Sequence, residues 1–529
     1  MKKQLLSIIF VILLGFSSMA QVWLTQGAGF TTASRGIMNI YPVNSQVVWA
    51  AAYDGTGGTN GCQDFTKTIN GGTTWTPGIV NATVGLQSSQ ITAADATTAW
   101  VCMYKATGSA AQGVYKTTDG GATWTHQATA LFTNSASFPD AIHFWDANTG
   151  WVLGDPISGK FEMYTTTDGG TTWTAVSGTN PAALSGEYGY TSNCAVAGNS
   201  IFFGTNKGRI FASTDKGHNW TVVTPPNFTG KNSFPAFKDA MNGLALKYQT
   251  SADTLLLLDK STDGGVTFTA ATYSGPVFTG EIQYVPGTAN TYVTTGVDAT
   301  NQPGRLGMTY SFDGGATWHY ETNILGNQAT TSAWLNDSTG WVGAFNGDAT
   351  DGLYKFNSVL SQPIANFATN DTALMLGGTA HYTNLSSGKP TTFAWTFQGG
   401  TPASSALQTP PAITYNTPGD YNVTLVATSD FGSSTKVKTG YIHVGGVGIN
   451  EHSSAVVSIF PNPVMDIMNI QGNSSIKQVQ IFNLVGQLVF SQELNSKTVT
   501  VNTSAIQTGV YNVKISMDNG TVNKKIVVK

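Results

Sequence analysis

The sequence has 529 residues, enough for several domains, with 10% charged residues, 60 glycines and a formal net charge of −4. A chain without a basic field is not expected to bind nucleic acid. Its many Thr, Ser, Asn, Val and aromatic residues favour all-β structure, because β-branched and aromatic side chains suit pleated surfaces.

The chain begins with two lysines, an apolar run from Leu5 to Phe16 and small residues that end at Ala20. This pattern is typical of a secretory signal peptide over residues 1–20, and the run is too short to span a bilayer. No other run is long enough, so the sequence predicts an exported mature chain without a transmembrane segment.

Export also makes disulfides possible, but the sequence offers few cysteines. Cys62 and Cys102 fall in neighbouring repeats and could pair, which would leave Cys194 over. The other interpretation is three small buried or half-buried thiols.

Six near-copies of one eight-residue pattern follow, with "TTDGGTTW" as the representative. They begin at Thr68, Thr117, Thr166, Ser213, Ser261 and Ser311, at intervals of 49, 49, 47, 48 and 50 residues. So regular a spacing indicates a repeated structural unit. Asp and Asn side chains bond backbone N–H groups in turns, and Gly takes the positive φ that such a turn needs. We therefore expect turn-capping roles, rather than ligand binding, for Asn70, Asp119, Asp168, Asp215, Asp263 and Asp313.

A weaker strand–turn–strand pattern precedes each copy and occurs a seventh time at residues 332–348. A unit of this length fits one four-stranded blade of a β-propeller. The seventh unit lacks a final strand, and Val22–Gln26 resembles the strand that follows each copy. If that segment completes the last blade, no sheet edge is left open. The sequence thus predicts a seven-bladed propeller over residues 21–360, with six blades as the alternative.

The eight-residue pattern resembles the Asp-box of BNR-repeat propellers, found in sialidases, xyloglucanases, sortilin-like receptors and photosystem II assembly-factor-like proteins. The segment "SFPDAIHFWDANTGWVLGDP" and the boxes are most similar to the assembly-factor-like family. Known members of that family are assembly or binding scaffolds, so the resemblance implies a non-catalytic role. The sequence predicts no cofactor and leaves room for a structural cation.

Residues 363–444 alternate apolar and polar residues over short strands, which is typical of a β-sandwich. The strand "FAWTFQGG" around Trp395 and the run "PGDYNVTLVATSDFGS" around Tyr421 resemble a PKD domain, an Ig-like module. Such modules are spacers or weak ligand-binders. Nothing catalytic occurs in this segment, which favours a spacer.

A Gly- and Ser-containing linker over residues 445–454 leads to a last β-module over residues 455–529. The module resembles the type A C-terminal sorting domain of the type IX secretion system of Bacteroidetes in Pro461-Asn462-Pro463, Gly486, Gly509-Val510-Tyr511 and the terminal Lys525. The resemblance implies that these residues engage the type IX machinery and that the protein is secreted or held at the outer-membrane surface. The competing interpretation is an ordinary C-terminal β-sandwich.

The propeller face opposite the boxes is where we expect a ligand. Aligning the innermost strands by their turns puts Asp140 and Glu281 at the same register in the third and sixth blades. Such carboxylates could act as acid and base of an inverting glycosidase if they lay roughly 6.5–9.5 Å apart. Solvated lining of the channel is the simpler interpretation.

Further candidates on this face are acids, aromatic residues and the three arginines of the chain. In sialidases an arginine cluster binds the substrate carboxylate in a bidentate manner. The sialidase motif Arg-Ile-Pro is absent from this sequence, in which Arg35 is followed by Gly36-Ile37. Asp348 and Asp351 could bind a hard cation or simply form a turn, and no zinc-spaced cluster or P-loop is present. The candidate ligand-binding residues are Arg35, His143, Asp155, Glu187, Tyr188, Tyr190, Arg209 and Arg305.

Two functions follow from these observations. The first is a secreted or surface-tethered propeller that binds a glycan or protein ligand without catalysis. The alternative is a secreted glycoside hydrolase, similar to sialidases or xyloglucanases, that uses the carboxylate pair Asp140 and Glu281.

Overall fold

The computed structural model describes residues 21–58, 61–106, 111–130, 132–247, 257–298, 305–321, 324, 328–445 and 455–529. The expected signal peptide and most of the expected linker lie outside these residues. The described part of the chain consists of strands and turns without a helix, which confirms the all-β prediction. No helix that could cross a membrane occurs in it.

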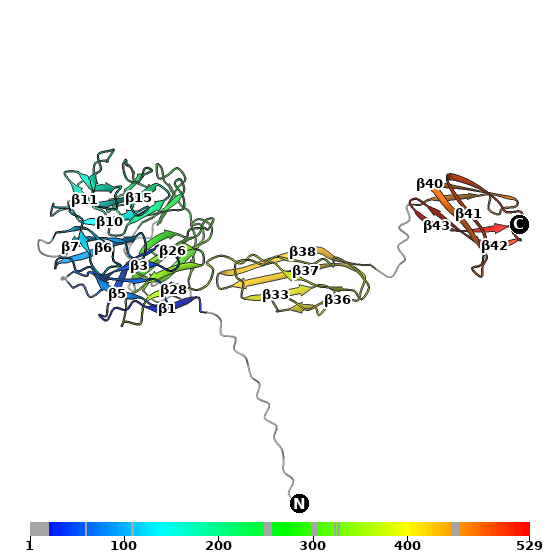
Figure 1. Ribbon diagram of the computed structural model, residues 1–529, viewed down its shortest axis with the longest axis horizontal. Coiled ribbons are helices and arrows are strands. Elements are labelled where there is room, and N and C mark those ends of the chain that lie inside the picture. Colours follow the sequence, from blue (N-terminus) through cyan, green and yellow to red (C-terminus); the bar gives the residue numbers. More distant parts are fainter. Residues whose placement is uncertain are drawn as a thin grey trace, which may run out of the picture.

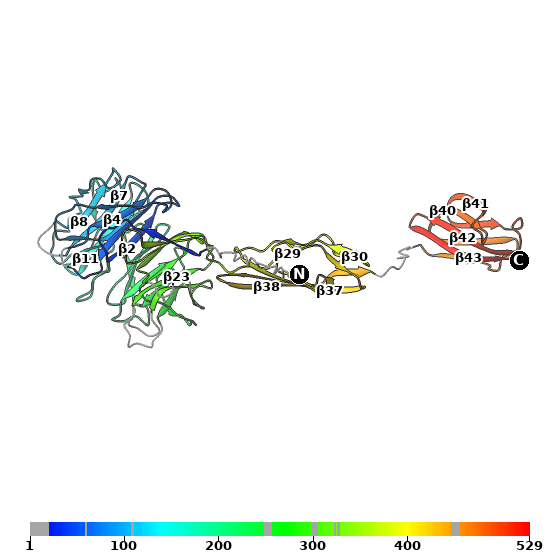
Figure 2. The ribbon, with the colours of Figure 1, turned by 90° about the horizontal axis from the view of Figure 1, so that it is seen from below.

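Residues 23–356 form seven four-stranded sheets within the described ranges. We number them blade 1 to blade 7 in the order of their first strands. These first strands are β2 (Arg35–Pro42), β6 (Leu86–Ala93), β10 (Pro139–Phe144), β14 (Cys194–Ala197), β18 (Ser233–Phe237), β22 (Glu281–Tyr284) and β26 (Thr331–Asn336). First strands of neighbouring blades contact one another, as β2 does with β6 and β26, so the blades surround a central channel. Figures 1 and 2 show the sheets gathered at one end of the molecule.

The second and third strands continue each blade outward through antiparallel pairing. The second strands are β3 (Val48–Asp54), β7 (Ala99–Lys105), β11 (Gly150–Ile157), β15 (Ser200–Gly204), β19 (Gly243–Lys247), β23 (Tyr292–Asp298) and β27 (Thr339–Gly343). The third strands are β4 (Asp64–Thr68), β8 (Gly113–Thr117), β12 (Lys160–Thr166), β16 (Ile210–Ser213), β20 (Leu258–Ser261), β24 (Arg305–Ser311) and β28 (Gly352–Phe356).

The outermost strand of blade 7 comes from the other end of the propeller segment. Blades 1 to 6 end in β5 (Thr76–Ile79), β9 (Thr125–His126), β13 (Thr174–Ala175), β17 (Thr221–Val223), β21 (Thr269–Ala270) and β25 (His319–Tyr320). In blade 7 this place belongs to β1 (Trp23–Gly27), which pairs antiparallel with β28 from Trp23 opposite Phe356 to Gly27 opposite Gly352. The prediction that the first mature strand completes the last blade is therefore confirmed, and the outer edge of β28 is paired.

The boxes form the turns between third and fourth strands, and all six make the same hydrogen bonds. In blade 3 the Thr166 hydroxyl donates to Asp168 Oδ1 at 2.9 Å and accepts from Gly170 N at 3.0 Å. Asp168 Oδ1 also accepts from Thr172 N at 2.8 Å. Gly169 and Gly170 have φ of 71° and 87°, a region that suits glycine. Hydrogen bonds led by the Thr123 hydroxyl lower the pKa of Asp119, in the box of blade 2, to about 2.

The box turn of blade 3 also joins its blade to the neighbouring one. Trp100 of β7 is fully buried and donates from Nε1 to the carbonyl of Gly169 at 3.0 Å. Lys116 of β8 donates to the same carbonyl at 2.8 Å. The box of blade 3 is thus held by two side chains of blade 2, which explains why the pattern demands a fixed backbone at this point.

Replacing Asp168 with Ala should lower the stability of the propeller modestly. The substitution removes the acceptor of one backbone N–H and one hydroxyl in an exposed turn, which costs about 1 kcal/mol. We expect a fall of roughly 2 °C in the midpoint measured by differential scanning calorimetry. Asp168→Asn is the control, because the first box uses Asn70 in the same bonds. A midpoint equal to that of the parent in Asp168→Ala would contradict the capping role.

Residues 364–445 form a β-sandwich beside the propeller. Its larger sheet has the order β30-β38-β37-β33-β35 and its smaller sheet the order β31-β36-β34, while β29 pairs with β32. The strands are β29 (Phe367–Ala368), β30 (Ala373–Met375), β31 (Thr379–Ala380), β32 (Thr383–Asn384), β33 (Thr392–Phe397), β34 (Gly400–Thr401), β35 (Ser404–Ser405), β36 (Ile413–Tyr415), β37 (Gly419–Ser429) and β38 (Gly432–Gly445). Its core includes Trp395, which is 1% exposed.

The sandwich contacts the propeller through the turn between β37 and β38. Phe431 lies 5.4 Å from Tyr310 and 5.9 Å from Phe356, measured between ring centroids. It is 3% exposed and belongs to the same apolar cluster as Trp23 and Trp334. The sandwich is therefore packed against the point at which the ring of blades closes. From there β37 and β38 extend away from the blades (Figures 1 and 2).

The last module, residues 455–529, is a sheet of order β39-β40-β42-β43 in which β41 also pairs with β40. Its strands are β39 (Val457–Phe460), β40 (Ile467–Phe482), β41 (Leu488–Asn502), β42 (Gly509–Met517) and β43 (Gly520–Val528). Buried Val, Ile and Met residues from all five strands form one separate core.

Candidate functional site

Two adjoining cavities occupy the channel. The channel cavity, of about 260 Å³, is lined by residues from every first strand and includes Asn39, Gln90, His143 and Gln283. The mouth cavity, of about 310 Å³, is lined by residues at or near the starts of the first strands of blades 1, 4, 5, 6 and 7 and by Tyr53 of β3. Ser192, Phe234 and Glu281 line both cavities. Glu281 therefore lies where the two cavities meet.

Polar side chains in the channel join blade 1 to blade 2, blade 2 to blade 3 and blade 6 to blade 7. Asn39 Oδ1 accepts from Ile91 N at 3.0 Å, and Gln90 Oε1 accepts from Ile142 N at 2.8 Å. Glu281 makes the equivalent contact between blades 6 and 7, because its Oε2 accepts from Ser332 N at 3.0 Å. Burial raises the pKa of Glu281, and hydrogen bonds partly offset that effect.

The expected register of Asp140 with Glu281 is wrong by one residue. Pairing of the first two strands ends at Phe144 opposite Gly150 in blade 3 and at Tyr284 opposite Tyr292 in blade 6. Three residues before these ends stand Ala141 and Glu281. Asp140 falls in a β-bulge between Pro139 and Ala141, which re-aims its side chain. It lines neither cavity, so the structure does not bring the two carboxyl groups together in the channel.

Asp140 instead forms a carboxyl pair with Asp155 of β11. Asp140 is 4% exposed, its side chain is hydrogen-bonded to that of Asp155, and its Oδ2 has no donor among the described residues. Asp155 Oδ1 accepts from Gly189 N at 3.0 Å. Burial, helped by the charge of Asp155, raises the pKa of Asp140 well above its usual range, and burial raises that of Asp155 to about 6. The pair is expected to hold one proton at neutral pH, since two adjacent buried carboxylates repel each other.

Replacing Asp155 with Asn should stabilise the propeller above pH 6. A carboxyl whose folded pKa is raised contributes stability below its unfolded pKa of 3.8, and loses it as the pH rises through about 6. The amide of the variant would not ionise. The difference between the thermal unfolding midpoint of the variant and that of the parent should therefore grow between pH 4.5 and pH 7.5. We expect a gain of roughly 1–3 kcal/mol at the upper end, measured by thermal unfolding across pH. Parallel pH profiles would contradict the shared proton, and Asp168→Asn on the exposed box is the control.

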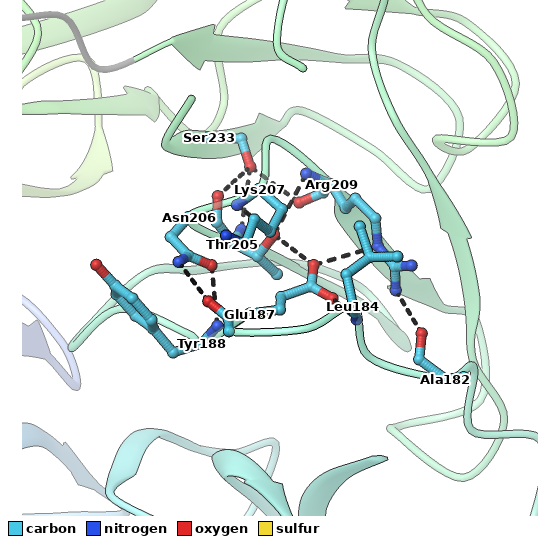
Figure 3. A network of polar contacts seen from close by, with 10 residues as sticks. Ala182, Leu184, Glu187, Tyr188, Thr205, Asn206, Lys207, Arg209 and Ser233 are labelled. Atoms are coloured by element: carbon cyan, nitrogen blue, oxygen red, sulfur yellow. Dashed lines mark hydrogen bonds and ion pairs between the residues drawn. The ribbon is translucent and has the colours of Figure 1, made fainter. Parts of the chain in front are cut away.

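The loop over residues 182–193, before β14, is fixed by a buried ion pair (Figure 3). The Glu187 carboxylate is fully buried and lies 3.2 Å from Arg209 Nε. It also accepts from the Thr205 hydroxyl at 2.7 Å and from Leu184 N at 2.8 Å. Arg209 Nη2 donates to the carbonyl of Ala182 at 2.9 Å. Glu187 and Arg209 were expected to bind a ligand, but here they neutralise each other and hold the loop.

Asn206 fixes the next part of this loop. The aromatic residues of the loop point outward. Asn206 Oδ1 accepts from Tyr188 N at 2.9 Å, and Asn206 Nδ2 donates to the carbonyl of Gly186 at 2.9 Å. Tyr188 remains 45% exposed, and its ring points away from Glu187 (Figure 3). Its ring lies 5.4 Å from that of Tyr190, which lies 5.8 Å from Phe234. We call Tyr188, Tyr190 and Phe234 the aromatic path, because it leads from an exposed loop to the mouth cavity.

The other arginines form no sialidase-like cluster in the described residues. Arg35 donates from Nε to Asp64 Oδ2 at 2.5 Å and lies 3.4 Å from Asp54 Oδ1, so its charge is balanced within blade 1. Arg209 is paired within blade 4. Arg305 is the first residue of β24, and its side chain lies outside what the structure describes.

The remaining candidate residues lie in the channel or in a turn. His143 lines the channel cavity, and burial lowers its pKa to about 4, so its ring is neutral at pH 7. Asp351 Oδ1 accepts from Gly347 N at 2.8 Å and Asp348 Oδ1 from Thr350 N at 2.7 Å, as in a plain turn. The described residues contain no group of three or more His, Cys, Asp or Glu that could hold a metal.

Cys62, Cys102 and Cys194 are all free thiols. The possible Cys62–Cys102 disulfide is therefore not formed.

Four family models match parts of the chain. Residues 91–231 match the photosynthesis system II assembly factor YCF48, and residues 309–320 match the BNR/Asp-box repeat. Residues 364–440 match the PKD domain, and residues 458–529 match the secretion system C-terminal sorting domain. The chain thus combines a BNR-type propeller, a PKD domain and a sorting domain, which places the protein outside the cell or on the outer-membrane surface.

The match to each curated relative covers only a small part of that relative. The ulvan lyase NLR42 of Nonlabens ulvanivorans is 32% identical over 85 residues, which are 16% of either chain. The trimeric autotransporter adhesin AtaA of Acinetobacter sp. (strain Tol 5) is 24% identical over 346 residues, which are 61% of this chain and 9% of the adhesin. The chain therefore spans less than a fifth of the length of each.

Among solved structures, YCF48 bound to D1 peptide is 14% identical, with a TM-score of 0.44 over 64% of this chain and 97% of the other. YCF48 from Cyanidioschyzon merolae gives 14% identity and 0.43 over 64% and 98%.

Proposed function

We propose that this protein is a surface-exposed propeller that binds a glycan at the mouth cavity without catalysis. The observation that carries the proposal is the aromatic path from the exposed ring of Tyr188 to Phe234 at the mouth cavity. Exposed aromatic residues beside a cavity mark binding sites, because they bury large areas at a low cost in conformational entropy.

The charges near the path favour an uncharged, hydroxyl-rich ligand over an acidic one. Arg35 is balanced by Asp54 and Asp64, and Arg209 is balanced by Glu187. The mouth cavity itself is lined by Thr191, Thr330 and Thr331 among other residues. Hydroxyl groups of this kind can donate and accept hydrogen bonds with sugar hydroxyls.

Replacing Tyr188 with Ala should weaken binding to the best ligand of a glycan panel roughly three- to tenfold. The estimate follows from about 0.5–1.5 kcal/mol for one aromatic contact. Affinity would be measured by calorimetry on the purified chain. Tyr188→Phe keeps the ring and should bind like the parent, and Leu184→Ala, on the same loop and 50% exposed, is the matched control. Equal affinity in Tyr188→Ala would overturn the proposed site, and a protein partner that competes at Tyr188 would overturn the choice of a glycan.

A glycoside hydrolase is the competing proposal, and the same panel tests it. Product release by the parent that is lost in Asp140→Asn and Glu281→Gln would establish catalysis. Two contacts argue against catalysis by these two residues. Asp140 turns away from the cavities to Asp155, and Glu281 joins blades 6 and 7 through Ser332. Binding without turnover would exclude the hydrolase.

A further inference from the structure

The described residues that line the channel cavity include one carboxylate and no cation to balance it. Among its lining residues Glu281 is the only acid, and none is Lys or Arg. His143 is neutral at pH 7, because burial lowers its pKa to about 4. The lining therefore carries a single negative charge once Glu281 is ionised. An ionised carboxylate surrounded by protein is costly unless it is paired, and a cation entering the channel would lower that cost.

Glu281 retains room for one more donor. Gln283 Nε2 donates to Oε1 at 2.7 Å, Ser332 N donates to Oε2 at 3.0 Å, and the Thr331 side chain supplies a third hydrogen bond. A carboxylate offers about four lone-pair sites, so roughly one remains. Part of the Glu281 side chain faces the channel rather than protein, because the residue is not fully buried and lines both cavities.

The rest of the lining suits a small ring that carries hydroxyl groups. Asn39, Gln90 and Ser192 line it with amide and hydroxyl groups, and Tyr41 and Phe234 provide aromatic surface. The two amide oxygens each accept one backbone N–H, and the Ser192 hydroxyl donates to the carbonyl of Ser89, so a ligand would use the donors and lone pairs that these bonds leave. The volume of about 260 Å³ lies below the roughly 300–1,000 Å³ of pockets for drug-sized ligands. The cavity is thus of a size for one sugar ring.

We propose that the channel cavity is a subsite for an amino sugar, with Glu281 accepting a hydrogen bond from the protonated amine. The inference rests on the proposed function for entry through the mouth cavity, and it names the class of glycan. Charge-assisted hydrogen bonds of this kind are about twice as strong as neutral ones. The remaining hydroxyls of the ring would meet Asn39, Gln90 and Gln283.

The test is calorimetry on the full chain with D-glucosamine, D-glucose and N-acetylglucosamine at about pH 6.5, below the pKa of roughly 7.7–8.0 typical of α-amino groups. Glucosamine should bind with a Kd on the order of 1 mM, and the two neutral sugars at least tenfold more weakly. Glu281→Gln keeps an acceptor for Ser332 N and should abolish the preference for the amine. Equal binding of the three sugars to the parent chain would overturn the subsite, and this comparison needs no variant.

Two further comparisons distinguish an amino-sugar subsite from a general ammonium site and from the mouth site. Nα-acetyl-lysine amide carries the same ammonium group without a sugar ring, and binding as tight as that of glucosamine would overturn the assignment to a sugar. Tyr188→Ala reports on the aromatic path, whereas Glu281→Gln reports on the channel. Loss of glycan binding in the first variant with intact glucosamine binding supports both sites. A response of glucosamine to Glu281→Gln alone, with no effect of Tyr188→Ala on any glycan, would retain the subsite and overturn the mouth site.

Discussion

A chain that ends before residue 455 should no longer reach the cell surface or the medium of a host with the type IX machinery. Residues 458–529 match the secretion system sorting domain, and their core is separate from that of the propeller. Removing them should leave the other domains folded and trapped inside the outer membrane. Immunoblotting of cell-envelope and medium fractions would measure the distribution, with near-complete loss of the exported form expected.

A matched control keeps the tail and removes only its cargo. Residues 455–529 fused behind a signal peptide and an unrelated folded reporter should bring that reporter across the outer membrane. Export of the truncated chain in normal amounts would show that the delivery signal lies elsewhere.

Replacing Glu187 with Ala should destabilise the propeller by roughly 3–5 kcal/mol. The substitution leaves the Arg209 guanidinium, whose side chain is 11% exposed, without its counter-ion, and breaking one side of a buried pair costs about this much. The Thr205 hydroxyl and Leu184 N–H lose their acceptor as well. Thermal unfolding should show a fall of roughly 6–15 °C in the midpoint, together with weaker glycan binding, because the loop that carries Tyr188 loses its support.

Glu187→Gln keeps one oxygen acceptor, for either Leu184 N or the Thr205 hydroxyl, and should recover part of the loss. Adding Arg209→Leu to Glu187→Ala removes the unpaired charge and should also recover stability. If the double variant were as unstable as the sum of the single ones, the two side chains would not act as a pair.

Local patterns in the sequence predicted most of the fold. The boxes could be interpreted because the hydrogen bonds that cap the turn lie within five residues, as the contacts of Asp168 with Thr166 and Thr172 show. The closing strand was predictable because Val22–Gln26 repeats the composition of the strands after the boxes. In both cases the decisive contacts are set by residue type and spacing.

The candidate site was harder to predict, because its geometry depends on contacts between blades and on irregular backbone. The bulge at Asp140 moves that residue out of register with Glu281, and no residue type at this position signals a bulge. Arg35 and Arg209 were matched as a cluster by number alone, whereas their partners Asp64 and Glu187 lie 29 and 22 residues away. Phe234 and Ser192 were missed. Counting back from the turn after each first strand would have placed Phe234 level with Glu281.

The contact of Phe431 with Phe356 has a mechanical consequence for a protein displayed outside the cell. In a protein held at the surface by its sorting domain, drag on the propeller would be transmitted through the PKD domain, and tension would enter the blades at the end of β28, next to Phe356. The neighbouring strand β1 runs antiparallel to β28 along five residue pairs. Because ladder hydrogen bonds lie across the strands, a pull along β28 stretches all of them together in shear instead of peeling them one at a time. The pairing at the seam of the ring is thus oriented to resist a pull along β28.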